Sequence, residues 1–303
     1  MSWRERLGRN WGRLGMRFNI WKDCPKVPIT ELLSFIVDNR GKTVPTADDG
    51  WKLIATNCVT NNTLFPVYEK VRYLTQETYE TWFRAHPMPG DILFVNKGTP
   101  GRVCLVPDPV DFCIAQDMIA LRADDEKIYN KYLFAVLRSR EIQQQIYNTN
   151  VGDVIPHFKK QFMDQLLIPV PDRRIQEIIG NLYYELSYKT ELNKKINKNL
   201  EQQAQAIYQQ MFIENQNPNW KEGKLSDLVA VKYGKDHKKL DGGCYPVYGS
   251  GGIMRYVEKP LYTGESVLIP RKGTLNNVMY VNGAFWSVDT MFYTEMLRPN
   301  IAK

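Results

Sequence analysis

The longest regular pattern of apolar positions in the chain lies between Arg173 and Phe212. Apolar side chains recur there every three or four residues, which predicts one continuous helix with a single apolar stripe. No proline interrupts the segment, and about forty residues at about 1.5 Å each make a rod of about 60 Å. The stripe comprises Ile175, Ile179, Leu182, Leu186, Asn193, Ile196, Leu200, Ala204, Ile207 and Met211.

A rod with one apolar stripe is typical of one strand of a coiled coil, which needs a partner helix. Lys189 and Asn193 interrupt the stripe, and polar residues on such a seam fix register and pairing at a cost in stability. The alternative is a long amphipathic helix that packs on a globular domain, but such helices seldom exceed about 25 residues. Pro171 and Asp172 predict the start of the helix, with Asp172 as its N-cap, and the polar run 215–219 predicts its end.

Ahead of this helix, short apolar runs alternate with turn residues. Such runs predict strands, whereas a period of three to four predicts helices. The expected strands cover residues 51–58, 91–95, 103–106, 112–115 and 118–121, with a further strand-like run at 166–171. The expected helices cover Ile29–Val37, Thr75–Phe83 and Tyr129–Tyr147.

The region after Trp220 repeats the first half of the chain. Gly264–Ile269 resembles Gly90–Val95, and Lys272-Gly273-Thr274 matches Lys97-Gly98-Thr99 at an offset of 175 residues. Asp289 corresponds to Asp117 at an offset of 172 residues. Order and spacing agree across several elements, which predicts a duplicated domain. The second copy stops fourteen residues after Asp289 without a second rod, so we expect either a truncated copy or a missing piece supplied by another chain.

The composition of the chain indicates the kind of binding partner. The chain has 303 residues, room for two domains, and carries a net charge of +7 with a pI of about 9.0, which favours a polyanionic partner. The rod segment 172–214 is neutral, with six basic and six acidic residues, whereas 221–303 has twelve basic and eight acidic residues. The positive charge therefore belongs to the domains on either side of the rod.

The composition also argues against several classes of protein and site. Five cysteines without a CxxC pair and only three histidines make a zinc site unexpected and favour a reducing cytoplasm. No apolar run is long enough for a membrane span, and the basic N-terminus lacks the apolar core of a secretory signal. Met16 is a candidate start codon. The sequence around Gly41-Lys42-Thr43 has Ile36 where a phosphate-binding loop needs glycine, so a turn is the expected structure.

Taken in order, these segments resemble the specificity (S) subunit of a Type I restriction–modification system over most of the chain after about residue 28. The resemblance rests on Gly90–Thr99 with its GD-x-L and KGT elements, on Ala115-Gln116-Asp117, on the segment 152–171, on the rod, and on the opening of the second domain at 220–228. It implies an α+β protein with two similar target-recognition domains, the second incomplete, joined by one long coiled-coil-type helix.

The resemblance also implies a domain organisation. It consists of a basic N-terminal extension (1–27), a first target-recognition domain (28–156), a conserved segment with the spacer helix (157–214), a linker (215–220) and a second target-recognition domain (221–303) that is C-terminally incomplete.

The function that the resemblance implies is sequence-specific binding of double-stranded DNA without catalysis by this chain. Methyltransferase (M) subunits would dock on it to methylate adenine, and restriction/translocase (R) subunits would join them in the cytoplasm. S-adenosylmethionine, ATP and Mg²⁺ would belong to those partners, with no cofactor or metal in this chain. A second S chain or a separately encoded half-subunit would supply the partner of the long helix.

Candidate DNA contacts follow from the chemistry of DNA recognition. Base edges are read by Arg, Lys, Asn, Gln and Thr, and phosphates are held by Lys, Arg and backbone amides. Both KGT turns present such residues at a loop tip. The candidates are Lys97, Thr99, Arg102, Gln116, His157, Lys159 and Lys160 in the first half, and Arg271, Lys272, Thr274, Asn276 and Asn277 in the second.

Other classes stay open at this point. Pro107-Asp108 with Asp125-Glu126-Lys127 superficially matches a PD-(D/E)xK nuclease, although these residues fall in expected loops. An amino-methyltransferase needs a [DN]PP[YF] motif, and Asn217-Pro218-Asn219-Trp220 lacks the second proline. A truncated, inactive S-subunit remnant and a purely structural coiled-coil adaptor are the remaining alternatives.

Overall fold

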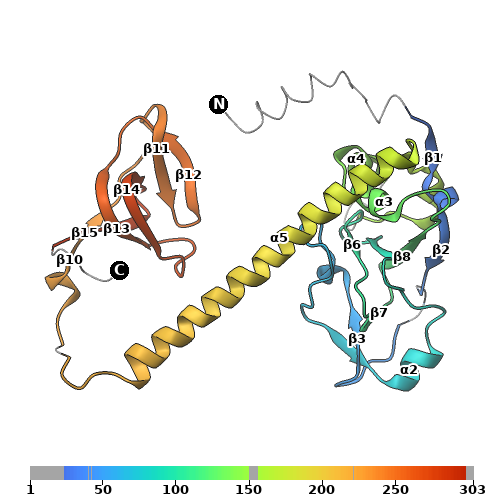
Figure 1. The fold of residues 1–303 in the computed structure, drawn as a ribbon, viewed down its shortest axis with the longest axis horizontal. Coiled ribbons are helices and arrows are strands. Elements are labelled where there is room, and N and C mark those ends of the chain that lie inside the picture. Colours follow the sequence, from blue (N-terminus) through green and yellow to red (C-terminus); the bar gives the residue numbers. More distant parts are fainter. Residues whose placement is uncertain (1–23, 40, 42, 150–155, 221, 298–303) are drawn as a thin grey trace. The chain divides into compact units, whose positions relative to one another are not determined.

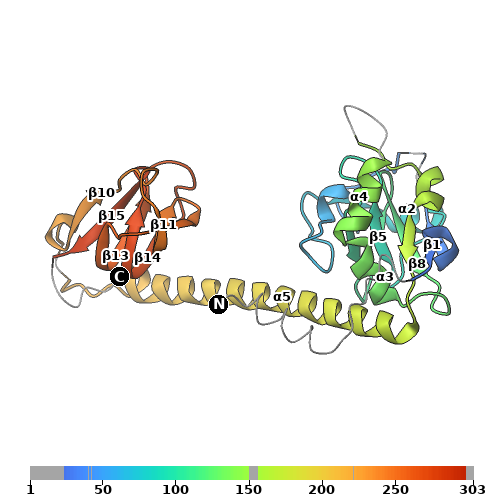
Figure 2. The same ribbon diagram turned by 90° about the horizontal axis from the view of Figure 1, so that it is seen from above.

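The computed structural model describes residues 24–39, 41, 43–149, 156–220 and 222–297. It is a mixed α+β chain with two compact units, residues 1–206 and 207–303, and a long helix α5, Arg173–Tyr208 (Figures 1 and 2). The expected N-terminal extension, including Met16, lies almost wholly outside the described residues. Among the described residues, no helix has the length and apolar character to cross a membrane.

The first unit is built on two small sheets. The strand order is β2-β8-β5-β6 in the larger sheet, all antiparallel, and β4-β3-β7 in the smaller one, where β3 and β7 run parallel. Of these strands, β5, β6, β7 and β8 confirm the predicted apolar runs, and β3 confirms the first part of the run at 51–58, which continues as a 3-10 helix at Thr56–Cys58, whereas β2 and β4 were not predicted as strands. Their bounds are β2 Leu33–Val37, β3 Trp51–Ile54, β4 Arg72–Leu74, β5 Ile92–Val95, β6 Val103–Leu105, β7 Phe112–Ile114 and β8 Met118–Ala123.

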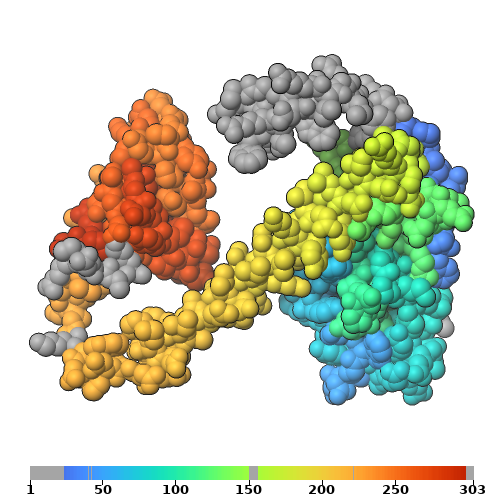
Figure 3. All heavy atoms as spheres, in the orientation of Figure 1, coloured from blue at the N-terminus to red at the C-terminus, as the bar shows by residue number. Residues whose placement is uncertain are grey.

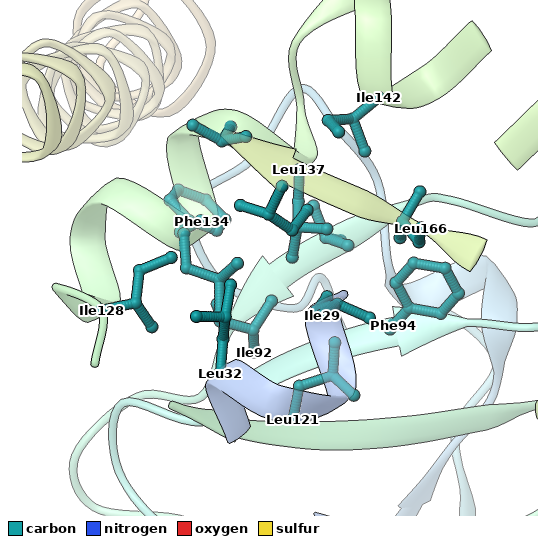
Figure 4. Close-up of a cluster of buried hydrophobic side chains, with 14 of the residues drawn as sticks. Ile29, Leu32, Ile92, Phe94, Leu121, Ile128, Phe134, Leu137, Ile142 and Leu166 are labelled. Carbon is teal, nitrogen blue, oxygen red and sulfur yellow. The ribbon is translucent and has the colours of Figure 1, made fainter. Parts of the chain in front are cut away.

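One face of the larger sheet is covered by the chain that follows it, and this contact forms the main core of the unit (Figure 4). Ile92, Phe94 and Leu121 point from the sheet toward Phe134 and Leu137, and all five are inaccessible to solvent. The covering elements are α3 Asn130–Leu137, α4 Arg140–Asn148, a 3-10 helix Lys160–Gln165, and β9 Leu167–Pro169, which pairs with β1 Lys26–Pro28. A second core lies on the other face.

Two local predictions are wrong. Ile29–Val37 is not a helix but a 3-10 turn, Ile29–Leu32, followed by β2, because its backbone pairs with β8. Tyr129–Tyr147 is two helices, because the chain turns at Ser139, whose hydroxyl accepts a hydrogen bond from Ile142 N (3.4 Å) and caps α4. The predicted helix at Thr75–Phe83 is confirmed as α2 Gln76–Thr81, with Thr75 as its N-cap.

The second unit has the strand order of the first. Its sheet runs β10-β15-β13-β14-β11-β12, with β11 parallel to β14 and every other neighbour antiparallel. β10, β15 and β13 take the places of β2, β8 and β5, and β11 and β12 take the places of β3 and β4. The single strand β14 takes the places of both β6 and β7. The bounds are β10 Val229–Tyr233, β11 Gly242–Gly249, β12 Gly252–Val257, β13 Tyr262–Pro270, β14 Met279–Ser287 and β15 Met291–Met296.

The two units differ in how many faces of the sheet are covered. The core of the second unit, around Leu268 and Phe285, corresponds to the second core of the first unit. On the other face, the offset of 175 residues places Val278 and Tyr280 at the positions that Val103 and Leu105 occupy in the first unit. Val278 and Tyr280 are 55% and 52% exposed, whereas Val103 and Leu105 are 0% and 4% exposed. Among the described residues of the second unit, nothing corresponds to the covering segment 128–169.

The Gly90-Asp91 pair has a structural role. Gly90 adopts a φ of 87°, and the Asp91 carboxylate accepts a hydrogen bond from Met88 N (2.8 Å). The same carboxylate accepts two hydrogen bonds from Arg122 of β8, from Nε and Nη2, both at 2.9 Å. Asp91 is 3% exposed. These hydrogen bonds raise the pKa of Arg122. The motif therefore joins the start of β5 to β8.

We expect Asp91→Ala to lower the free energy of unfolding of the first unit by about 2 kcal/mol, because it leaves Arg122 and the Met88 amide without their partner. Urea unfolding followed by circular dichroism measures the change. Asp48→Ala is the matched control, because Asp48 is exposed. Equal transitions for Asp91→Ala and the control would contradict the structural role.

Candidate functional site

The KGT turn of the first unit is held from two sides. β5 ends at Val95, and the next amide, Asn96 N, donates to Asp117 O (2.7 Å). Phe158 N donates to Asn96 O (2.7 Å), and Gly98 N donates to Pro156 O (3.0 Å). The turn is therefore tied both to the end of β7 and to the segment that starts at Pro156.

These ties bring distant parts of the sequence around one hollow of about 570 Å³. Lys97 and His157 form an isolated antiparallel bridge, and Gln116 lies beside Asp117 in the turn between β7 and β8. Asp117 has a φ of 61°, a left-handed backbone that aspartate tolerates better than most residues. The hollow is lined by Asp38, Gly41, Arg84, Lys97, Gln116, Asp117 and His157. Three of the predicted residues thus share one concave surface, which we call the Lys97 hollow.

Sequence reasoning missed Arg84 in this hollow. Its position depends on Asn39, whose side chain donates to Ala85 O (2.8 Å) and Ile114 O (3.1 Å) and accepts from Arg84 N (3.0 Å). Asn39 is buried. A smaller hollow next to it contains Arg72 together with Gln116 and Asp117. No local signal marks Arg84, because the contacts that place it span more than forty residues.

The other predicted residues of the first unit do not line the Lys97 hollow. Thr99 and Arg102 are half-buried within the turn, where Arg102 N donates to Thr99 O (3.4 Å). Lys159 is exposed. Lys160 forms an ion pair with Asp38 (3.4 Å), so its charge is partly compensated.

The KGT turn of the second unit has the same glycine geometry but different side-chain contacts. Gly98 and Gly273 both have a φ of 85°. Arg271 lies over the rings of Tyr233 and Phe292, at 4.9 and 5.3 Å, and is thus held by the sheet. Asn277 donates to Ser250 O (2.8 Å). Lys272, Thr274 and Asn276 are exposed at the tip of the turn.

A polar cluster beside the parallel strands braces this part of the first unit. Asp111 accepts hydrogen bonds from Lys52 and from the hydroxyl of Tyr68. Burial raises the pKa of Asp111, but the hydrogen bonds from Lys52 and Tyr68 outweigh it, so the pKa lies below its usual value. Burial and the contact with Asp111 raise the pKa of Tyr68. This cluster ties β3 to the start of β7.

The residues of the nuclease alternative do not assemble into a site. Lys127 pairs with Asp124 (2.9 Å) in the loop after β8, and the backbone carbonyl of Asp125 accepts a hydrogen bond from Arg173. Across the described ranges, no three His, Cys, Asp or Glu side chains lie close enough to hold a metal ion.

Burial raises the pKa of the Cys113 thiol to about 12, so this thiol is protonated at neutral pH.

Helix α5 presents different faces to the first unit and to solvent. Asp172 caps it as predicted, accepting from Ile175 N (3.1 Å). The face packed on the first unit carries Gln176 and Gly180, both buried. One turn further, Tyr183 forms an edge-to-face contact with Phe134 (5.9 Å), and Tyr184 lies under the Lys131 ammonium (4.2 Å).

Ile179, near the start of the predicted stripe, packs against the first core, whereas the stripe is open to solvent further along the helix. Its large residues from Leu182 onward are about half exposed, for example Leu182 at 55% and Leu200 at 56%, and beyond Glu191 the whole helix is exposed (Figure 3). Only Ile175 and Ile179 of the stripe are half-buried. The helix thus packs on a globular unit near its start and still carries an uncovered apolar stripe.

The matching strand orders, the repeated glycine turn and the long helix define a protein with two related sheet units and a spacer helix. A family model described as "Type I restriction modification DNA specificity domain" matches residues 27–202, more than half of the chain. The chain therefore belongs to the Type I restriction–modification specificity family.

Two comparisons describe the relatives. The HindI specificity subunit of Haemophilus influenzae is 27% identical over 148 residues, which cover 47% of this chain and 32% of that subunit. The chain therefore matches about a third of this relative's length. The crystal structure of a Type I S subunit from M. genitalium superposes with a TM-score of 0.63 at 19% identity, covering 94% of this chain and 76% of the other. The second comparison shows a shared fold.

The two glycines of the turn give a matched pair of substitutions. Gly98 and Gly101 have φ values of 85° and 87°, but a Cβ at Gly98 meets nothing within 4 Å, whereas one at Gly101 lies 3.1 Å from Gln143 Oε1 and 3.2 Å from Ile146. We expect Gly98→Ala to cost about 1 kcal/mol of stability from backbone strain alone, and Gly101→Ala about 3 kcal/mol. Urea unfolding of both variants tests this, and equal losses would contradict it.

Proposed function

We propose that this chain is the subunit of a Type I restriction–modification complex that reads the DNA sequence. The Lys97 hollow is the observation that carries the proposal. It gathers Lys97, Arg84, Gln116 and His157, the side-chain types that contact phosphates and base edges. Membership of the specificity family and the net charge of +7 point to the same partner, double-stranded DNA.

The two units act as two target-recognition domains, each reading one half of a bipartite sequence. The common strand order and the glycine at a φ of 85° in both KGT turns support this assignment. Lys272, Thr274 and Asn276 are the exposed candidates in the second turn. Arg271 and Asn277 act there by shaping the turn, because both are held by neighbouring groups. The uncovered sheet face with Val278 and Tyr280 supports the view that the second domain is an incomplete copy.

Catalysis and cofactors belong to the partners in this proposal. M subunits bind S-adenosylmethionine and methylate adenine, and R subunits use ATP and Mg²⁺ for translocation and cleavage in the cytoplasm. The chain directs both activities by holding them on a specific site. The apolar stripe of α5 pairs with a second helix, from another copy of the chain or a separately encoded half-subunit, because about half of each large side chain from Leu182 onward is open to solvent.

The test of this function is co-expression with the neighbouring methyltransferase subunit, followed by mapping of adenine methylation on genomic DNA. Methylation within one bipartite motif supports the proposal. A stable complex that leaves no methylation identifies a silent remnant. A chain that forms no complex and shows no salt-dependent DNA binding acts as a structural adaptor instead.

Two substitutions in the hollow separate phosphate from base contacts. We expect Lys97→Gln to weaken binding to all sequences and to reduce the slope of log K against log salt by about 1, because one phosphate contact is lost. Gln116→Ala should leave the slope of log K against log salt unchanged. It should lower the discrimination between bases at one position of the half-site by about 1–3 kcal/mol. Binding by the complex to its mapped motif at several salt concentrations measures both.

The control for these variants is Lys26→Gln, which removes an exposed lysine from β1, outside the hollow. The assignment of the hollow fails if Lys97→Gln and Lys26→Gln have the same effect on DNA affinity.

Helix pairing is tested with two lysine substitutions that differ only in the face they occupy. We expect Leu200→Lys to weaken self-association, or association with the half-subunit, by at least about tenfold, because it places a charge on the apolar seam. Gln202→Lys, two residues further along an exposed part of the helix, should have no effect. Sedimentation velocity over a range of concentrations gives the dissociation constants. A wild-type chain that stays monomeric and binds no half-subunit would rule out the pairing.

A further inference from the structure

A second, smaller hollow of the first unit lies beside the Lys97 hollow. It has a volume of about 60 Å³, and Gln116 and Asp117 line both hollows. Its other walls come from β3, from the start of β4 with Arg72, and from Thr56. We call it the Arg72 hollow. It is too small to enclose a base that has left the duplex, but one edge of a base pair can meet it.

The order of the strands explains why these residues meet. β3 and β7 run parallel, with Ile54 beside Ile114, so the two strands end at the same edge of the sheet. β4 runs antiparallel to β3 and pairs Arg72 with Leu53, so its start lies at that edge as well. The sheet therefore places Arg72 near the turn after β7, which carries Asp117.

The guanidinium of Arg72 is available to a ligand. Arg72 is exposed, and no described residue forms a hydrogen bond or an ion pair with its side chain. In contrast, Arg84 Nη1 donates to Asp38 O (3.2 Å), and Arg122 is held by Asp91. Arginine presents its N–H donors in a fixed fork, which matches two neighbouring acceptors on one ligand. Arg72 can therefore recognise such a pair of acceptors without giving up a contact within the described part of the protein.

Asp117 supplies an acceptor in the same hollow. Its backbone carbonyl accepts from Asn96 N (2.7 Å) and Lys97 N (3.2 Å), and its φ of 61° is left-handed. These contacts fix the backbone, whereas the side chain has no hydrogen-bond or ion-pair partner among the described residues. A carboxylate repels phosphate, so it would weaken a hollow that served only the DNA backbone. The carboxylate instead indicates a ligand that offers an N–H donor beside the two acceptors.

We propose that the Arg72 hollow reads one G·C base pair in the major groove. Guanine presents two acceptors there, N7 and O6, and its partner cytosine presents the N4 amino group as a donor. Arg72 donates to N7 and O6, and Asp117 accepts from N4. An A·T pair places an acceptor and a donor on adenine, which the arginine fork does not match. This inference rests on the proposed function and adds the identity of one base pair that the first unit reads.

The second unit does not repeat this arrangement among its described residues. β12 takes the place of β4 and carries Arg255. Arg255 is half-buried, and its Nη2 donates to Leu240 O (2.5 Å), so its guanidinium is already held by the protein. The preference for a G·C pair therefore belongs to the half-site that the first unit reads.

The first measurement maps adenine methylation by the full complex with its methyltransferase. It compares the wild type with Arg72→Gln and with the control Arg174→Gln, which makes the same change at an exposed position of α5. In Arg72→Gln, sites with another base pair at one G·C position of one half-site should gain methylation about tenfold relative to the original sites. The wild type and Arg174→Gln should share one motif.

Two substitutions of Asp117 separate its acceptor from its charge. Asp117→Gly removes the carboxylate and is compatible with the left-handed backbone, whereas Asp117→Asn keeps one acceptor oxygen and also tolerates this backbone. Both remove a negative charge and should strengthen binding to all sequences equally. Only Asp117→Gly should lower discrimination, at the same G·C position as Arg72→Gln and by about tenfold. A residue that served only the turn would leave the base preference unchanged in both variants.

A measurement with unaltered protein covers the case in which Arg72→Gln folds poorly. Each guanine of the half-site is replaced in turn by 7-deazaguanine, which lacks the N7 acceptor, and binding by the wild-type complex is measured by fluorescence anisotropy. At the position where Asp117→Gly loses discrimination, this replacement should lower affinity about tenfold. With Arg72→Gln, the same replacement should have no effect.

The outcomes separate the two hypotheses. Absence of bipartite methylation in the wild type refutes the proposed function and this inference with it. A bipartite motif whose base preferences Arg72→Gln leaves unchanged overturns the inference alone. The same holds if Arg72→Gln and Asp117→Gly act at different base pairs, or if binding depends on the N7 atom of no guanine in the half-site.

Discussion

The close approach of α5 to α3 at Gly180 is the contact on which the arrangement of the first unit depends. Because Gly180 has no side chain, the backbones of α5 and α3 can come into contact. The face of α5 that contacts the rest of the first unit carries Gln176, Gly180, Tyr183 and Tyr184. From Leu182 onward, the apolar stripe is left open to solvent. Burial of such a stripe requires another apolar surface, and a second helix is the partner that we propose for it.

The two units share a sheet but differ in the elements that pack on its faces. Both have the same strand order, and both bury one face of the sheet around residues such as Leu93 and Leu268. Within the described part of the chain, only the first also buries the second face, where residues such as Ile128, Leu137 and Ile168 pack across it.

Sequence reasoning succeeded where the signal is local. The period of the long helix, the cap at Asp172, the short strands and the repeated turn all depend on neighbours within a few residues. It failed at Ile29–Val37 and at Ser139, where pairing with β8 and a capping hydroxyl decide the structure. It also missed Arg84, which Asn39 places from across the fold, and it could not tell that the aspartate of the Gly90-Asp91 motif is buried against Arg122.

The buried Asp91–Arg122 pair separates two electrostatic regimes in one molecule. Ions in solution screen exposed charges over about 10 Å at 0.1 M salt, but they reach a carboxylate that is 3% exposed much less. Lysines at the loop tips therefore lose their attraction for a polyanion at salt concentrations that leave this internal pair intact. If the chain binds DNA as proposed, salt can release it and it can rebind while its first unit stays folded.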